Sequence, residues 1–214
     1  MEVMLLVIGL TLLALISAAL HIRAESVGPK RNVYLFKPLT MTWIILIALL
    51  AEGRVSSFYK YMIVAGLICS LLGDIFLMLP SDRFVPGLLS FLVAHLFYIA
   101  AFASGETRLN TIRYAIPFLI YGSMMLLLLL PHLGRMKLPV IVYLIVIMVM
   151  AWQALSRWLG TEQAGSGVAF FGALLFTVSD SILAVNRFKG RVEHAQFYIL
   201  STYFTAQWLI ALSV

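Results

Sequence analysis

Eight stretches of the chain are nearly free of charged residues, and this pattern leaves few folds open to it. They cover residues 3–22, 32–51, 61–81, 84–105, 114–134, 138–156, 163–186 and 194–214. Each is close to the ~20 apolar residues with which an α-helix crosses the hydrocarbon core of a bilayer. The apolar residues are continuous and do not alternate with period two, which disfavours a β-barrel. We therefore expect an all-α fold, a membrane bundle of eight transmembrane helices that forms one domain over residues 1–214.

The composition supports a membrane protein over a soluble one. Charged residues make up 11% of the chain, against roughly 25% in soluble domains. The net charge is +6, but the basic residues are scattered, so no stripe for nucleic acid forms. The first stretch is too long for the apolar region of a signal peptide, and we interpret it as a helix. Cys69, the single cysteine, excludes an internal disulfide, and we interpret it as a small apolar residue.

Only three charged residues lie inside the eight stretches: Lys37, Asp74 and Asp180. A charge at the centre of a bilayer costs at least ~2.5 kcal/mol on insertion scales, so such residues usually face the bundle interior. Both aspartates are placed roughly 9 Å inside the same end of the bundle, at 1.5 Å per residue, and this predicts one shared site. The alternatives are an acid pair that only fixes helix contacts and, for Lys37, a side chain that reaches the membrane surface. Pro38 after Lys37 suits a first helical turn.

The sequence around the two aspartates repeats weakly. They are 106 residues apart, and each is followed by an Arg-Phe pair. The stretches that contain them run in the same direction, so a four-plus-four internal duplication is possible.

Polar side chains on two other stretches are candidates for lining the shared site: His95, Tyr98, Tyr203 and Gln207. Hydrogen bonds between helices explain each of them equally well when taken singly. A zinc site of His95, His194 and the aspartates is disfavoured, because no two histidines stand four residues apart. We expect no metal and no organic cofactor. The sequence gives no indication of an oligomeric state.

Five short motifs, in order along the chain, resemble the YhhN-like lysoplasmalogenase family. They are Phe36-Lys37-Pro38-Leu39, Gly66 to Gly73-Asp74, Ala94-His95-Leu96-Phe97-Tyr98, Gly172 to Ser179-Asp180, and Tyr203 to Gln207. The resemblance implies an integral membrane hydrolase that cleaves the vinyl ether bond of lysoplasmalogens, giving a fatty aldehyde and a glycerophospho-base. It implies Asp74 and Asp180 as the family aspartates and Lys37 as the family lysine.

The implied chemistry suits the residues. A vinyl ether hydrolyses by protonation at carbon, and the resulting oxocarbenium ion captures water, a problem that glycosidases solve with two carboxyl groups. We expect Asp74 and Asp180 to be the acid–base pair, with Thr177 and Ser179 favouring Asp180 as the ionised member. Lys37 is expected to bind the phosphate of a lysophospholipid substrate. The alternatives are a proton- or cation-coupled transporter that uses the aspartates, and a structural membrane protein.

The basic residues predict how the chain is oriented in a membrane. The connections after the first, third, fifth and seventh stretches, with Lys37, hold ten of the 15 Lys and Arg residues. Because basic loops stay in the cytoplasm, both termini should lie outside it, with the site toward the cytoplasmic side of a bacterial inner membrane. A reporter that works only outside the cytoplasm should therefore be active when fused after Val214. A silent reporter there, with a cytoplasmic one active, would reverse the orientation.

Overall fold

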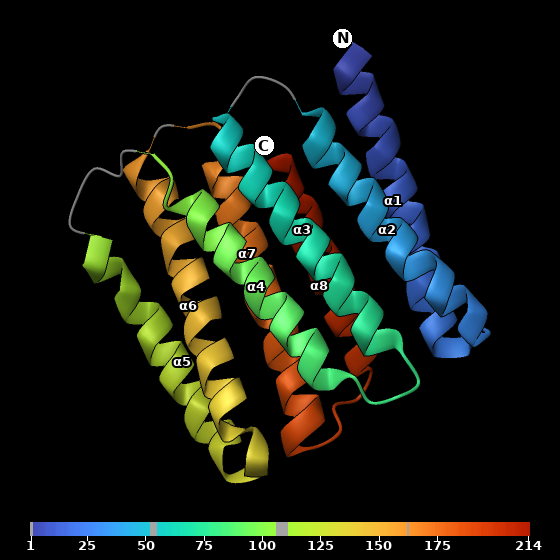
Figure 1. Cartoon of the computed structure of the whole chain (residues 1–214), viewed down its shortest axis with the longest axis vertical. Helices are drawn as coiled ribbons and strands as arrows, with labels where there is room; N and C mark the ends of the chain where they lie inside the picture. Colours follow the sequence, from blue (N-terminus) through green and yellow to red (C-terminus); the bar gives the residue numbers. More distant parts are fainter. Residues whose placement is uncertain (1, 52–54, 106–110, 162) are drawn as a thin grey trace.

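Eight long α-helices form the described part of the chain (Figure 1). The computed structural model describes residues 2–51, 55–105, 111–161 and 163–214. In these ranges the helices are α1 (Glu2–Val27), α2 (Lys30–Leu50), α3 (Ser57–Met78), α4 (Phe84–Phe102), α5 (Ile116–Leu129), α6 (Lys137–Gly160), α7 (Ser166–Ala184) and α8 (Ala195–Leu212). The expected all-α bundle is confirmed, and no strand occurs in the described ranges.

Short helices adjoin the long ones at their ends. Three are 3-10 helices: η1 (Thr111–Ala115), η2 (Leu130–His132) and η3 (Gly134–Met136). The fourth, η4 (Val185–Lys189), is a π-helical turn that continues α7. Among the described residues, seven helical segments are long and apolar enough to span a membrane. The 18-residue helix α8 is outside this set and carries Gln196, Tyr203 and Gln207.

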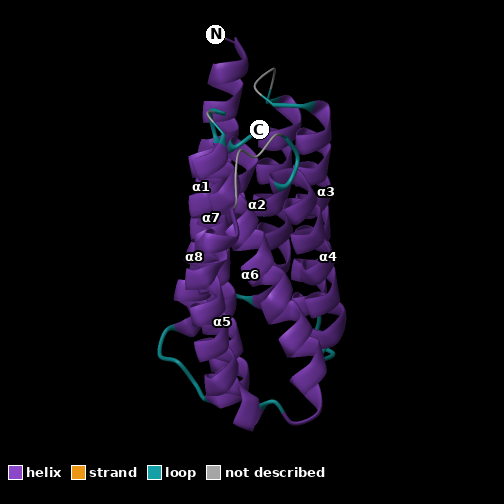
Figure 2. Cartoon of the chain, turned by 90° about the vertical axis from the view of Figure 1, so that its left-hand side faces the viewer, coloured by secondary structure: helices purple, strands orange, loops and turns teal. Residues whose placement is uncertain are grey.

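The helices run along one common axis, with their connections at the two ends (Figure 2). The closest packing is between sequence neighbours, in the pairs α3–α4, α7–α8 and α1–α2. Helix α5 packs mainly against α6 and is peripheral. Both termini lie at the same end of the bundle (Figure 1).

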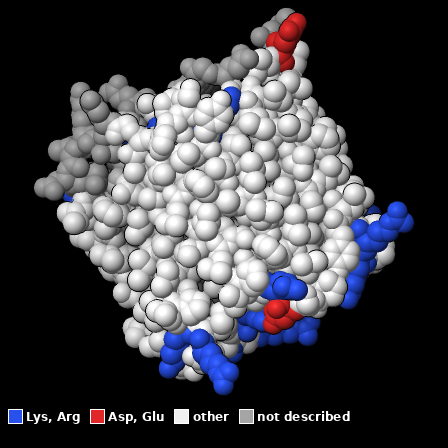
Figure 3. Space-filling view, viewed as in Figure 1, with Lys and Arg blue, Asp and Glu red and all other residues white. Residues whose placement is uncertain are grey.

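Basic side chains gather at the opposite end from the termini, which we call the basic end. Figure 3 shows Lys and Arg there, over the α1–α2, α3–α4, α5–α6 and α7–α8 connections, and an almost uncharged surface between the two ends. An uncharged band flanked by charge is the surface that a bilayer requires.

Two prolines define how their helices begin. Pro117 lies in the first turn of α5, where its missing N–H costs no hydrogen bond. The prediction for Pro38 was wrong, because α2 already begins at Lys30 and Pro38 lies inside it. As a result, Lys37 lies seven residues inside the helix, or roughly 10 Å at 1.5 Å per residue.

Glycines allow α3 and α4 to approach closely. A Cβ on Gly66 would come within 2.3 Å of the Tyr98 ring, and a Cβ on Gly73 within 2.7 Å of the Phe91 ring. The Tyr98 side chain is fully buried and donates a hydrogen bond to Gln207 at 2.8 Å, so it has little room to move. Gly66 is therefore required by packing.

We expect Gly66→Ala to lower the midpoint of thermal unfolding by several degrees, since overpacking a core costs about 1–3 kcal/mol. The matched control is Gly9→Ala on α1, where an added Cβ meets nothing within 4 Å. Both changes have the same intrinsic helix propensity, so their difference isolates the Tyr98 contact. Equal midpoints for the two variants, measured in detergent, would contradict this account.

Candidate active site

A polar cavity of about 600 Å³ opens at the basic end. Its wall is built by α1, α2, α3, α4, α7 and α8 together with the α3–α4 connection and η4. The charged and amide side chains that line it are Glu25, Lys37, Asp74, Asp82, Arg83, Asp180, Asn186, Arg187 and Gln196. Asp74 and Asp180, from two helices far apart in sequence, therefore share one cavity.

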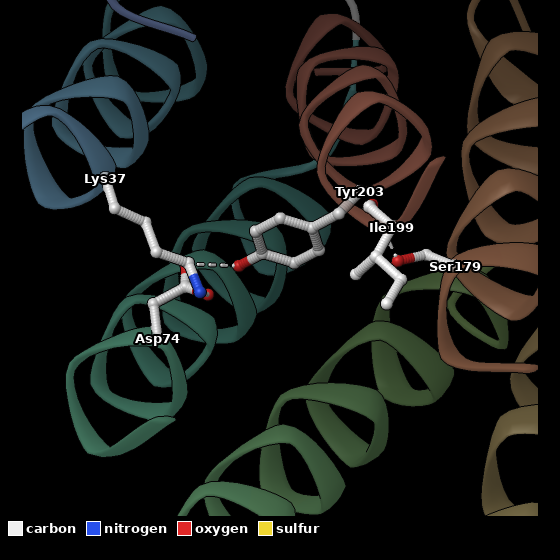
Figure 4. A network of polar contacts seen from close by, with 5 residues as sticks. All are labelled: Lys37, Asp74, Ser179, Ile199 and Tyr203. Atoms are coloured by element: carbon white, nitrogen blue, oxygen red, sulfur yellow. Dashed lines mark hydrogen bonds and ion pairs between the residues drawn. The ribbon is translucent and has the colours of Figure 1, made fainter. Parts of the chain in front are cut away.

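Asp74 lies at the centre of a buried polar cluster (Figure 4). Lys37 Nζ is 3.0 Å from Asp74 Oδ1, and the Tyr203 hydroxyl donates to Asp74 Oδ2 at 2.6 Å. The side chains of Lys37 and Asp74 are 11% and 2% exposed. These contacts join α2, α3 and α8, and give the Asp74 carboxylate both a cation and a hydrogen-bond donor.

Asp180 has a different environment. The Tyr143 hydroxyl, from α6, donates a hydrogen bond to Asp180 Oδ2. No Lys, Arg or His in the described ranges forms an ion pair with Asp180. Asp180 is half-buried, and it lacks the cation that stabilises the charge of Asp74, so the two aspartates differ in the charge that their surroundings support.

The sequence argument for an ionised Asp180 does not match this geometry. The Ser179 hydroxyl donates to the Ile199 carbonyl at 3.0 Å (Figure 4), and the Thr177 hydroxyl donates to the Ala173 carbonyl at 3.0 Å. Both hydroxyls are thus used to bond helix backbone, the first across to α8 and the second within α7.

The predicted substrate-binding residues fall into two groups. Lys37 and Tyr203 line the cavity, but His95, Tyr98 and Gln207 are not part of its wall. These three are fully buried behind Tyr203 and Phe176. Tyr98 donates to Gln207, while the His95 ring lies 5.2 Å from that of Tyr143 and 4.7 Å from that of Phe176. Their direct contact with a substrate stays a prediction.

A cluster of aromatic and charged side chains borders the cavity at its mouth. Arg187 of η4 lies 2.5 Å from Asp82 and 5.0 Å from the centre of the Phe84 ring. The Phe84 ring in turn meets Phe188 edge to face, with 5.6 Å between centroids. The hydrogen bond from Arg187 holds the pKa of Asp82 below its ordinary value. Arg83 and Arg187 provide guanidinium groups at the mouth, a suitable environment for a phosphate.

An apolar pocket adjoins the polar cavity. It lies between α4, α5, α6 and α7, and among its lining residues are Leu88, Met125, Leu129, Val140, Leu144, Ile147 and Met148. Asp180 belongs to the wall of both spaces. Its carboxyl group therefore lies where a polar compartment meets an apolar one.

Tyr143 is the main residue that the sequence analysis missed. It is the only tyrosine in the stretch 138–156, which is otherwise strongly apolar. That isolation was a usable signal, since a buried tyrosine hydroxyl normally finds a hydrogen-bond partner. What the sequence lacked was the position of α6 relative to α7. In the described ranges, no group of three or more His, Cys, Asp and Glu residues is arranged to hold a metal.

We expect Lys37→Met to destabilise the protein strongly, because removing one partner of a buried ion pair costs about 3–5 kcal/mol. Adding Asp74→Asn should restore much of that loss, since no unpaired carboxylate then remains. Lys30→Met, at an exposed position of the same helix, is the matched control and should be nearly neutral. Denaturation in detergent measures the free energy of unfolding of these three variants and of the unaltered protein. A double variant no more stable than Lys37→Met would show that the pair does not act as described.

Comparisons with known proteins place this chain in a family. The model of the YhhN family matches residues 32–214. Human lysoplasmalogenase TMEM86B is 38% identical over 156 residues, which is 72% of this chain and 64% of the human protein. The chain thus spans less than two thirds of that relative. Human lysoplasmalogenase TMEM86A is 35% identical over 82% of the chain and 74% of its own length.

A bacterial relative matches over a greater share of both chains. The uncharacterized membrane protein YhhN of Escherichia coli is 29% identical over 199 residues, which is 93% of this chain and 95% of that protein. No solved structure matches the chain. The family match covers the helices that carry Lys37, both aspartates and their tyrosines, and on this evidence the chain belongs to the YhhN family of membrane proteins.

Proposed function

We propose that this protein is a membrane-embedded hydrolase that cleaves the vinyl ether bond of a lysoplasmalogen, or of a closely related lysolipid. The products are a fatty aldehyde and a glycerophospho-base. Relatives at 35–38% identity carry the name lysoplasmalogenase, which supports this reaction class. The active site would face the cytoplasmic leaflet of a bacterial inner membrane, in keeping with the cavity at the basic end.

One observation carries the proposal: Asp180 lies at the junction of the polar cavity and the apolar pocket. In a lysoplasmalogen the vinyl ether also lies at a junction, between the glycerophospho headgroup and the single hydrocarbon chain. A headgroup in the cavity and a chain in the pocket would bring the scissile bond to Asp180. Arg83 and Arg187 at the mouth of the cavity supply positive charge for the phosphate.

The contrast between the aspartates supports different roles for them in the proposed reaction. Asp180, without a cation partner, is the neutral acid that donates its proton to the vinyl carbon beyond the ether carbon. Asp74, paired with Lys37 at 3.0 Å, is the carboxylate that stabilises the oxocarbenium ion. Water then adds to the ether carbon and loses a proton to the Asp180 carboxylate, which restores the acid. The hemiacetal collapses to aldehyde and alcohol as the proton of its hydroxyl is transferred to the departing glycerol oxygen.

Lys37 has a different role in this scheme from the one expected on sequence grounds. Its ammonium group contacts Asp74, so its first effect is on the charge of that carboxylate. A lipid phosphate could approach the cavity through the arginines at the mouth without breaking the Lys37–Asp74 pair.

The second candidate, a transporter, has less support. The cavity is lined by residues from the basic-end half of the helices, and behind it lie the fully buried side chains of Tyr98, Phe176 and Gln207. Among the described residues, its polar lining stops there. A transport path requires access from both sides in turn.

The decisive experiment incubates the purified protein with a lysoplasmalogen and, separately, with its saturated ether analogue, and measures aldehyde release. Only the vinyl ether should be cleaved, since only a vinyl ether can be protonated at carbon. Asp74→Asn and Asp180→Asn should each lower turnover at least 100-fold, in the range attributed to acid–base groups. The double variant should be little worse than either single one.

The matched control for these variants is Glu193→Gln, which neutralises an acid whose side chain is 90% exposed. Its turnover should equal that of the unaltered protein. Cleavage of both ethers at equal rates would refute vinyl ether protonation. Near-normal turnover in either Asn variant, with the protein folded, would refute the acid–base pair.

A further inference from the structure

A second apolar groove lies on the outer side of the α5–α6 seam. It has a volume of about 190 Å³ and is lined by residues such as Phe118, Leu119, Leu126 and Ile145. Leu119 and Ile145 are 64% and 57% exposed, so the groove opens toward the surface that lipid would cover. Among the described residues, its polar lining is limited to the Ser123 hydroxyl and the indole N–H of Trp152. Its chemistry therefore suits a hydrocarbon chain.

This groove lies next to the pocket beside Asp180 and is separated from it by side chains that line both spaces. Leu144 and Met148 belong to the walls of both spaces. On the α5 side Gly122 faces Met148, and a Cβ at Gly122 would come within 3.0 Å of the Met148 side chain. Two side chains thus separate the spaces, and one of them is an unbranched, flexible methionine, a residue type that adapts readily to a new neighbour.

The helix that forms the outer wall is also the least anchored. Apart from the short helices next to it, α5 packs mainly against α6. The pocket beside Asp180 has a volume of about 60 Å³, much less than the groove. The groove offers a long chain that starts at Asp180 a further apolar space across the Gly122–Met148 contact.

We propose that the groove between α5 and α6 is the subsite for the distal part of the substrate's hydrocarbon chain, reached past Met148 from the pocket at Asp180. The inference rests on the proposed function, because it takes the occupant to be the single chain of a lysolipid. Met148 and Gly122 then determine how long a chain the protein accepts. Short chains end in the inner pocket, and longer chains displace Met148 and continue into the groove.

The test compares lysolipids whose chains have about 10 and about 18 carbons, because only the longer chain extends past the inner pocket into the groove. Gly122→Leu fills the seam at a position that lines the groove and is not part of the wall of the inner pocket. It should lower kcat/KM for the long chain at least tenfold and for the short chain less than twofold. Met148→Ala should raise the long-to-short ratio. Ile120→Phe, on the exposed side of α5 and outside both linings, should leave the ratio unchanged.

A binding measurement separates this inference from the proposed reaction. Saturated ether lysolipids of the same two lengths compete with a fluorescent lysolipid for the purified protein, with no bond cleaved. The same length-dependent loss in Gly122→Leu supports the subsite even if no aldehyde is ever released, in which case the proposed function fails alone. If Gly122→Leu weakens both lengths equally, or neither, and Met148→Ala leaves the ratio unchanged, the subsite is refuted.

Discussion

The buried pair of Lys37 and Asp74 is the constraint on which the rest of the structure depends. A charge removed from water inside a membrane protein must find its partner within the protein. Here the partners come from α2 and α3, at 3.0 Å, and Tyr203 adds a hydrogen bond from α8. Three helices are thereby held around one carboxylate. The glycines of α3, which let α4 approach closely, complete the frame in which the cavity forms.

The second aspartate, Asp180, differs from Asp74 in the side chains that contact its carboxyl group. Asp180 has a tyrosine partner, as Asp74 does, but no cation among the described residues. Two carboxyl groups in one cavity thus have unequal partners, as the proposed acid–base roles require. Phe176 packs against Tyr203, the partner of Asp74, and against His95. The His95 ring in turn packs against Tyr143, the partner of Asp180. The inequality of the aspartates is therefore built into the packing of the core.

The position of the site matches an amphiphilic substrate. The polar cavity opens at the basic end, where the arginines lie, and the apolar pocket extends from Asp180 toward α5 and α6. A lysolipid has the same polarity along its length. Membership of the YhhN family, with relatives named lysoplasmalogenase, agrees with the proposal of a lysolipid substrate.

The sequence alone determined the fold class and the identity of the key charges. Eight apolar stretches require helices because lipid offers the backbone no hydrogen bonds, and the cost of burying charge singled out Lys37, Asp74 and Asp180 within them. Only the tertiary structure decided their partners. The Lys37–Asp74 pair, the Tyr143–Asp180 bond and the depth of His95, Tyr98 and Gln207 all depend on how helices are rotated against one another. Helix periodicity indicates which residues share a face. Which two faces meet is set by close packing across the bundle, as in the contact of Gly66 with the Tyr98 ring.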